Sequence, residues 1–146
     1  MKYKNIICPV DGSELTEKAV EMAAYLSKIS DAKLILLNVV EKWYRSEPIV
    51  TNSKEWIAIH EDWLNEGREL LEKQAKALQE GGVKHMETVL REGDAAYEIL
   101  SLAGERNADL IVMATHRYSP VGKLFMGSVT DRVTKKSPCP VLWVFA

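Results

Sequence analysis

The sequence has few cysteines: two among 146 residues, Cys8 and Cys139. They do not form a C-x-x-C pair, and each lies against a strand-like apolar run, which argues against a redox motif or a zinc knuckle. A free cysteine behaves mainly as a small core hydrophobe. We therefore expect two plain buried thiols.

The sequence also lacks long apolar runs and an excess of either charge. The apolar stretches at 34–40 and 141–145 fall far short of the roughly 18 residues that a membrane-spanning helix requires, and the N-terminus has no apolar signal region. Nineteen basic and 21 acidic side chains give a formal net charge of -2, so no overall field attracts nucleic acid or anionic lipid. We expect a cytoplasmic protein that binds neither nucleic acid nor membrane, and any anion site must be local.

Common catalytic and ligand motifs are missing as well. The sequence contains no G-x-x-x-x-G-K-[ST], no G-x-S-x-G and no G-x-G-x-x-G. Its three histidines, His60, His85 and His116, show no metal-ligand spacing such as H-E-x-x-H. No nucleophile is paired with a general base along the sequence. We expect no dedicated metal site and no efficient catalysis.

What the sequence does contain is a regular alternation of apolar, strand-like runs with amphipathic segments. With 47% hydrophobic and 27% charged residues, it has the composition of one globular domain spanning residues 1–146. Strands are expected at 5–10, 32–40, 85–92, 109–114 and 140–146, with helices at about 14–30, 54–80, 93–107 and 127–136. Strands that alternate with helices predict an α/β domain of three layers, with a parallel sheet between helices.

Local signals mark the starts and faces of these helices. Ser13 offers an N-cap for the first helix, and Ser128 with Asp131 resembles a capping box for the last. The second helix carries two parallel stripes with seven-residue spacing and should bury a wide face. These stripes comprise Ile57, Leu64, Leu71 and Leu78, and Trp56, Trp63, Leu70 and Ala77. The polar stretch before this helix, at 42–53, predicts a loop that is mobile in the free protein.

Three stretches could form a ligand site, because ligands of open parallel sheets bind beyond the carboxyl ends of the strands. They are 9–13, which contains Asp11, then 38–41, and the loop at 114–133 with Gly127-Ser128. Free amides at the start of a helix can bind phosphate oxygens, and a carboxylate at a strand end can accept a ribose hydroxyl. Each feature also has a structural explanation, since Gly-Ser can simply cap a helix and Asp-Gly favours a turn.

Three segments together resemble the universal stress protein family across nearly the whole chain. They are KNIICPVDGSELTEKAVEMA, EGDAAYEILSLAGERNADLIVMATH and GSVTDRVTKKSPCPVLWV. The resemblance implies a Rossmann-like, adenine nucleotide α-hydrolase-like fold, with a five-stranded parallel sheet in the order 3-2-1-4-5. Many members of this family are dimers of one such domain.

The ATP-binding branch of the family carries G-x-x-G, nine residues and then G-[S/T]. Here the corresponding residues are 114–117, then 118–126, then Gly127-Ser128, so the spacing is kept while both early glycines are replaced. The resemblance puts the adenine, ribose and phosphate contacts of a nucleotide on Pro9, Val10, Asp11, Val39, Met113, Ala114, His116, Gly127, Ser128 and Val129. Arg117 stands where relatives have glycine, and its guanidinium either pairs with phosphate or fills the pocket.

The resemblance predicts a dimeric, cytoplasmic stress-response module that binds ATP, with or without Mg²⁺, ADP or AMP, and signals occupancy to an unidentified protein partner. The uninterrupted apolar run Val141 to Phe145 is the expected dimer edge. Two alternatives stay open: a nucleotide-free dimer, and a slow ATP hydrolase with a metal ion on Asp11. A phospho-receiver domain is disfavoured, because the third strand ends at 90–93 without the aspartate that such a domain phosphorylates.

Overall fold

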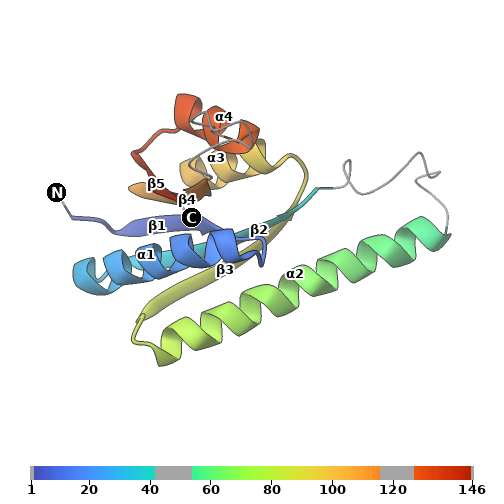
Figure 1. Cartoon of the computed structure of the whole chain (residues 1–146), viewed down its shortest axis with the longest axis horizontal. Coiled ribbons are helices and arrows are strands. Elements are labelled where there is room, and N and C mark those ends of the chain that lie inside the picture. The colour runs from blue at the N-terminus through green and yellow to red at the C-terminus, as the bar shows by residue number, and fades with distance from the viewer. Residues whose placement is uncertain (1, 42–53, 116–126, 146) are drawn as a thin grey trace.

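Five strands alternate with four helices in the computed structural model of the chain, which describes residues 2–41, 54–115 and 127–145 (Figure 1). The elements are β1 (Asn5–Pro9), α1 (Glu14–Ser30), β2 (Lys33–Val40), α2 (Lys54–Glu80), β3 (His85–Glu92), α3 (Ala95–Glu105), β4 (Leu110–Thr115), α4 (Ser128–Lys136) and β5 (Val141–Phe145). Each expected strand and helix is present, with bounds that differ by a few residues at most. The expected loop at 42–53 and its mobility lie outside the described residues.

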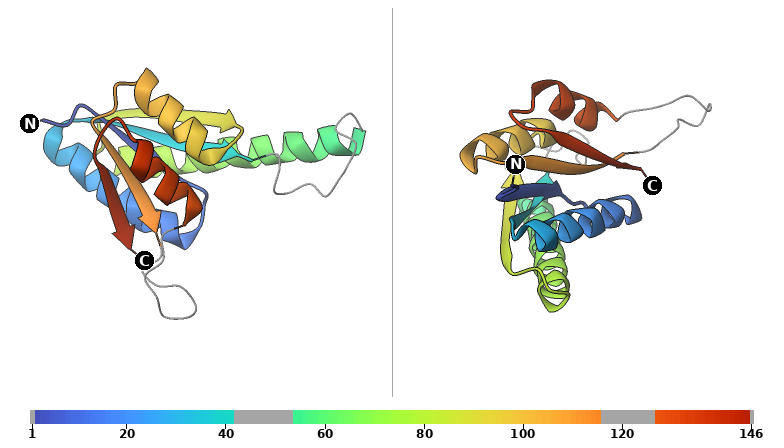
Figure 2. Two further views of the ribbon diagram at one scale, coloured as in Figure 1. Left: turned by 90° about the horizontal axis from the view of Figure 1, so that it is seen from above. Right: turned by 90° about the vertical axis from the view of Figure 1, so that its left-hand side faces the viewer.

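The strands form a single parallel sheet in the order β3-β2-β1-β4-β5. Helices α1 and α2 cover one face of this sheet, and α3 and α4 cover the other (Figure 2). The three-layer fold with strand order 3-2-1-4-5, expected from the resemblance, is therefore confirmed. No helix in residues 2–41, 54–115 or 127–145 is long and apolar enough to cross a membrane.

The central strands carry uninterrupted apolar runs, such as Leu34 to Leu37 of β2, because they have helices on both sides. In β2, Leu34 and Leu36 belong to the core beneath α1 and α2, whereas Ile35 and Leu37 belong to the core beneath α3. Successive side chains of a strand point to opposite faces, so a strand covered on both faces is apolar at consecutive positions, except where a buried polar group such as Asn38 has a hydrogen-bond partner. This is why uninterrupted runs, rather than alternating ones, mark these strands in the sequence.

The two expected helix caps have different outcomes. The Ser13 side chain accepts a hydrogen bond from the Thr16 amide, so the N-cap of α1 is confirmed. The capping box of Ser128 and Asp131 is wrong: Gly127 is the N-cap of α4, and the Asp131 amide donates to the Gly127 carbonyl. Ser128 is thus the first helical residue, one position too late for its hydroxyl to act as the cap.

Helix α2 buries a narrower stripe than its heptad pattern predicted. Trp56, Leu64 and Leu71 are buried, but Ile57 is 54% exposed and Ala77 is exposed. A straight helix has 3.6 residues per turn, so a seven-residue repeat drifts by about 20° each time and leaves the contact face. The N-terminal part of α2 also extends beyond the ends of the strands (Figures 1 and 2).

The two cysteines also differ. Cys8 lies in the core, and burial raises the pKa of its thiol to about 12. Cys139 is only partly buried, so the expectation of two buried thiols is wrong for this one. It follows α4 at the turn into the edge strand β5, where one side of the chain faces solvent.

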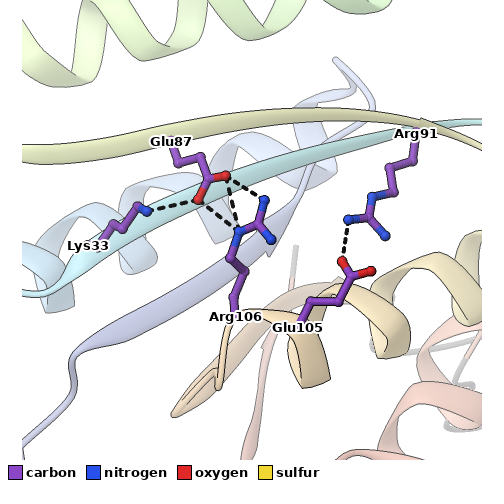
Figure 3. A network of polar contacts seen from close by, with 5 residues as sticks. All are labelled: Lys33, Glu87, Arg91, Glu105 and Arg106. Carbon is purple, nitrogen blue, oxygen red and sulfur yellow. Dashed lines mark hydrogen bonds and ion pairs between the residues drawn. The ribbon is translucent and has the colours of Figure 1, made fainter.

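A group of ion pairs fastens the other edge of the sheet (Figure 3). Glu87 of β3 accepts hydrogen bonds from the Arg106 guanidinium, and its Oε1 lies 2.9 Å from the Lys33 ammonium. The arginine hydrogen bonds, reinforced by the lysine, lower the pKa of Glu87 to about 2 against the opposing effect of burial. Arg91 pairs with Glu105 in the same way. These contacts connect β3 with β2 and with the end of α3.

Candidate functional site

A cavity of about 380 Å³ opens at the carboxyl ends of the central strands. Its walls come from the ends of β1, β2 and β4 and from the first turns of α1, α3 and α4. The lining residues are Pro9, Val10, Asp11, Leu15, Thr16, Leu37, Val39, Glu41, Ala95, Ile99, Met113, Ala114, Val129 and Thr130. Mostly apolar walls with a few polar groups are typical of sites for small organic ligands, which occupy about 300 to 1,000 Å³.

The cavity lies between β1 and β4, where the strand order of the sheet reverses. The ladder joining these strands pairs Ile6 with Leu110 and Ile7 with Ile111, although both strands continue beyond these pairs. The Val10 amide donates to the Leu37 carbonyl of β2. Because successive backbone amides of a strand point to opposite neighbours, the amide nitrogen of Pro9 faces β4, and proline has no N–H to donate. The strands are therefore free to separate at this end, which is the usual ligand crevice of such sheets.

Asp11 combines a structural role with a free acceptor. Its Oδ1 accepts hydrogen bonds from the Ser13 amide at 2.9 Å and from the Thr16 hydroxyl at 3.2 Å. These bonds fix the turn from β1 into α1, in which Gly12 has a φ of 84°. Its Oδ2 has no hydrogen-bond partner in the described ranges. The turn and the ligand explanations of Asp11 are thus compatible, because each uses a different oxygen.

A buried amide holds the neighbouring wall in place. The Asn38 side chain of β2 donates from Nδ2 to the Val10 carbonyl at 2.8 Å, and Val10 lines the cavity. Helix α2 contributes Gly67 above this contact: a Cβ there would lie 2.8 Å from Asn38 Oδ1 and 2.7 Å from Leu90 Cδ1. A glycine is therefore needed for α2 to approach the sheet closely enough to cover the Asn38 side chain.

Of the three helices that start at the cavity, α3 and α4 differ in what covers their first turn. At α3 the Asp94 side chain accepts from the Tyr97 amide at 2.9 Å, and Glu41 Oε1 accepts from the Ala95 amide at 3.0 Å. At α4 the N-cap is Gly127, which has no side chain to accept such a bond. Because carboxylates already occupy the amides of α3, the start of α4 is the better place for an anion.

Charge favours the same helix start. Asp94 also pairs with Arg132 of α4, at 3.0 Å from both terminal nitrogens, and this contact lowers the pKa of the aspartate. The start of α3 thus carries two carboxylates, from Asp94 and Glu41, that would repel a phosphate, whereas the first turn of α4 carries one, Asp131, which pairs with Lys135 at 3.0 Å. In the described ranges no three or more histidine, cysteine, aspartate or glutamate side chains converge to hold a metal ion.

Seven of the residues predicted from the sequence line this cavity: Pro9, Val10, Asp11, Val39, Met113, Ala114 and Val129. Gly127 and Ser128 directly precede Val129 at the start of α4 but are not among the lining residues. His116 and Arg117 lie outside the described residues, so their roles stay predictions. Sequence reasoning missed Glu41 and Ala95, although Glu41 ends a stretch that the strand-end rule had singled out.

Known proteins resemble the whole chain. The sequence profile of the universal stress protein family matches residues 2–144. Universal stress protein MJ0531 of Methanocaldococcus jannaschii is 38% identical over 97% of this chain and 82% of its own length. Universal stress protein YxiE of Bacillus subtilis is 31% identical over 97% of this chain and 99% of its own.

Solved structures share the fold. Universal stress protein UspA from Lactobacillus plantarum has a TM-score of 0.83, at 20% identity and 99% coverage of both chains. An Arabidopsis thaliana family protein with AMP bound has a TM-score of 0.70, at 21% identity, over 97% of this chain and 91% of that one. A complex with dAMP from Archaeoglobus fulgidus has a TM-score of 0.67, at 21% identity and 98% coverage of both.

Proposed function

Because the chain belongs to the universal stress protein family, we propose that it binds an adenine nucleotide, ATP, ADP or AMP, in the cavity between β1 and β4. The observation that carries this proposal is that the cavity has a hydrogen-bond acceptor at one side and a helix start with free donors at the other. Within the part of the chain that the structure describes, Asp11 offers a carboxylate oxygen without a hydrogen-bond partner on one side, and α4 begins without a side-chain cap on the other. The AMP and dAMP complexes of proteins with the same fold support the choice of ligand.

The chemistry of the walls gives the nucleotide a direction. Asp11 Oδ2 can accept a hydrogen bond from a ribose hydroxyl, because an ionised carboxylate has only acceptors. The phosphates lie toward Gly127 and Ser128, where free amides and the helix dipole favour negative charge. A cavity of about 380 Å³ suits a base with its sugar, while the phosphates reach beyond it to the start of α4. Magnesium, where ATP carries it, is held chiefly by phosphate oxygens.

We assign the protein a role in stress response through nucleotide occupancy rather than through turnover, with β5 as the dimer edge. Val141–Phe145 is an apolar strand at the sheet edge, and its residues are only partly buried or exposed. Such an edge can pair with a second copy of itself. The partial exposure of β5 supports a dimer that pairs along this strand. A protein partner would then sense whether nucleotide occupies the cavity.

Titration calorimetry with AMP, ADP and ATP tests the proposal on the wild type and on Asp11→Asn. The amide keeps one oxygen for the turn but replaces the second acceptor with a donor, so we expect the affinity for all three nucleotides to fall roughly tenfold or more. Asp31→Asn is the matched control, since Asp31 is the C-cap of α1 at the amino ends of the strands, opposite the cavity, and its substitution should not alter binding.

Two further measurements separate this proposal from its alternatives. Mass spectrometry of small molecules released from protein purified without added ligand should detect an adenine nucleotide. A wild type that releases none and gives no heat with any of the three nucleotides would instead be a nucleotide-free module. Steady ATP turnover that Ser128→Ala abolishes would favour the slow hydrolase.

A further inference from the structure

Glu41 provides the one ionisable side chain on the β2 side of the described cavity lining. It follows Leu37 and Val39 at alternate positions of the same segment, so all three face α3. Its Oε1 accepts the Ala95 amide proton at 3.0 Å, across 54 residues of sequence. Its Oε2 has no hydrogen-bond partner among residues 2–41, 54–115 and 127–145. The carboxylate is thus fixed at one oxygen and available at the other.

The base of the nucleotide belongs at this end of the cavity. This step rests on the proposed function, in which the phosphates lie at the start of α4 and the ribose at Asp11. The remaining space is bounded by Val39 and Ile99, whose apolar side chains suit the faces of a flat ring. A base that enters this space meets the Glu41 carboxylate as its polar neighbour.

We propose that Glu41 is a specificity-determining residue, which selects a purine with an amino group at its six-position over one with a carbonyl there. An ionised carboxylate accepts hydrogen bonds and cannot donate them. The amino group of adenine is a donor, whereas the oxygen at the same position of a six-oxopurine is an acceptor. A six-oxopurine in the same position would place its carbonyl opposite this acceptor, and its nearest donor, the N1–H, lies one ring position away. To regain a hydrogen bond the base would have to shift in a partly closed site, where unmatched polar groups are costly.

The anchor on α3 makes this selection effective. A free glutamate side chain could rotate away from a mismatched base and restore its hydration. The bond to the Ala95 amide holds Oε1, so turning the carboxylate away would leave that helix amide without its partner. The position of Oε2 is therefore set by the fold before any ligand binds.

Titration calorimetry with ATP and ITP tests this assignment, because the two nucleotides share ribose and phosphates and differ in the purine at the six-position. We expect the wild type to bind ATP roughly 10 to 100 times more tightly than ITP. In Glu41→Gln the amide oxygen can still accept from Ala95, and the new amino group can donate to a carbonyl. The ratio should therefore fall at least fivefold, with ITP gaining. Glu69→Gln, on the exposed face of α2, is the control and should leave the ratio unchanged.

Each other outcome has a distinct meaning. If the wild type binds ATP and ITP equally, or if Glu41→Gln weakens both by the same factor, Glu41 does not read the base and this inference is overturned while nucleotide binding stands. If Glu41→Gln keeps the wild-type ratio and Glu41→Ala only lowers the melting temperature, Glu41 serves solely as a cap for α3. If the wild type binds neither nucleotide nor AMP, the proposed function fails and this inference fails with it.

Discussion

Replacing Gly67 by alanine should destabilise the protein, although glycine is a poor residue for the middle of a helix. In an open site, alanine gains about 1 kcal/mol over glycine in a helix interior. At Gly67 the added Cβ would lie 2.7 Å from Leu90 Cδ1 and 2.8 Å from Asn38 Oδ1, closer than ordinary contacts allow. Asn38 cannot move freely, because its amide donates to the Val10 carbonyl.

The expected size of this effect follows from those contacts. Overpacking of a core costs about 1 to 3 kcal/mol, and losing a buried hydrogen bond costs about 1 to 3 kcal/mol. Both costs arise from the same displacement, so they overlap rather than add. After the helix gain of about 1 kcal/mol is subtracted, the free energy of unfolding of Gly67→Ala should be lower than that of the wild type by up to about 2 kcal/mol. Nucleotide affinity should fall as well, because Val10 lines the cavity.

Urea unfolding followed by tryptophan fluorescence and far-ultraviolet circular dichroism measures the difference. Gly104→Ala is the matched control: Gly104 also lies in a helix, but nothing lies within 4 Å of a Cβ placed there. We expect that variant to be unchanged or up to about 1 kcal/mol more stable. If Gly67→Ala is stabilised as much as Gly104→Ala, then α2 does not press on Asn38 and the argument is refuted.

Three further predictions concern pH, phosphate binding and assembly. Because the pKa of Glu87 is lowered to about 2, its contribution to stability is complete above about pH 5 and is lost as the pH falls toward 2. Glu87→Gln should therefore lower the free energy of unfolding by about 1 to 2 kcal/mol at pH 7 and by less at pH 3. The partly exposed cations limit the size of this effect. An equal loss at both pH values, or the same loss in the exposed control Glu80→Gln, would contradict this. Arg117→Gly should weaken ATP binding roughly tenfold more than adenosine binding if the arginine pairs with phosphate, whereas newly gained binding would mean that the arginine blocks the pocket. Phe145→Lys should convert a dimer into a monomer in light scattering, and a wild type that is already monomeric at micromolar concentration would rule out the β5 interface.

The sequence by itself determined the order of the strands and helices, because their signals are local. Uninterrupted runs such as 34–37 mark strands covered on both faces, and Ser13 marks the start of α1 through a contact three residues away. The rule that ligands bind beyond the ends of parallel strands then singled out Asp11 and the stretch 38–41, and the family resemblance supplied the strand order and the individual site residues, Val39 among them. Seven of the expected site residues line one cavity for this reason.

Only the tertiary structure decided which polar groups remain available in that cavity. The bond from Glu41 to the Ala95 amide spans 54 residues, and nothing near either residue in sequence signals it. The same holds for Gly67, which looks like a defect in a helix until Asn38 is placed beneath it. The start of α4 shows that sequence reasoning is limited even between adjacent residues. Gly127 and Ser128 are both plausible N-caps, and the structure assigns the N-cap to Gly127. Periodicity and caps are set within a few residues of chain, whereas the pairing of polar groups depends on how the sheet brings distant segments together.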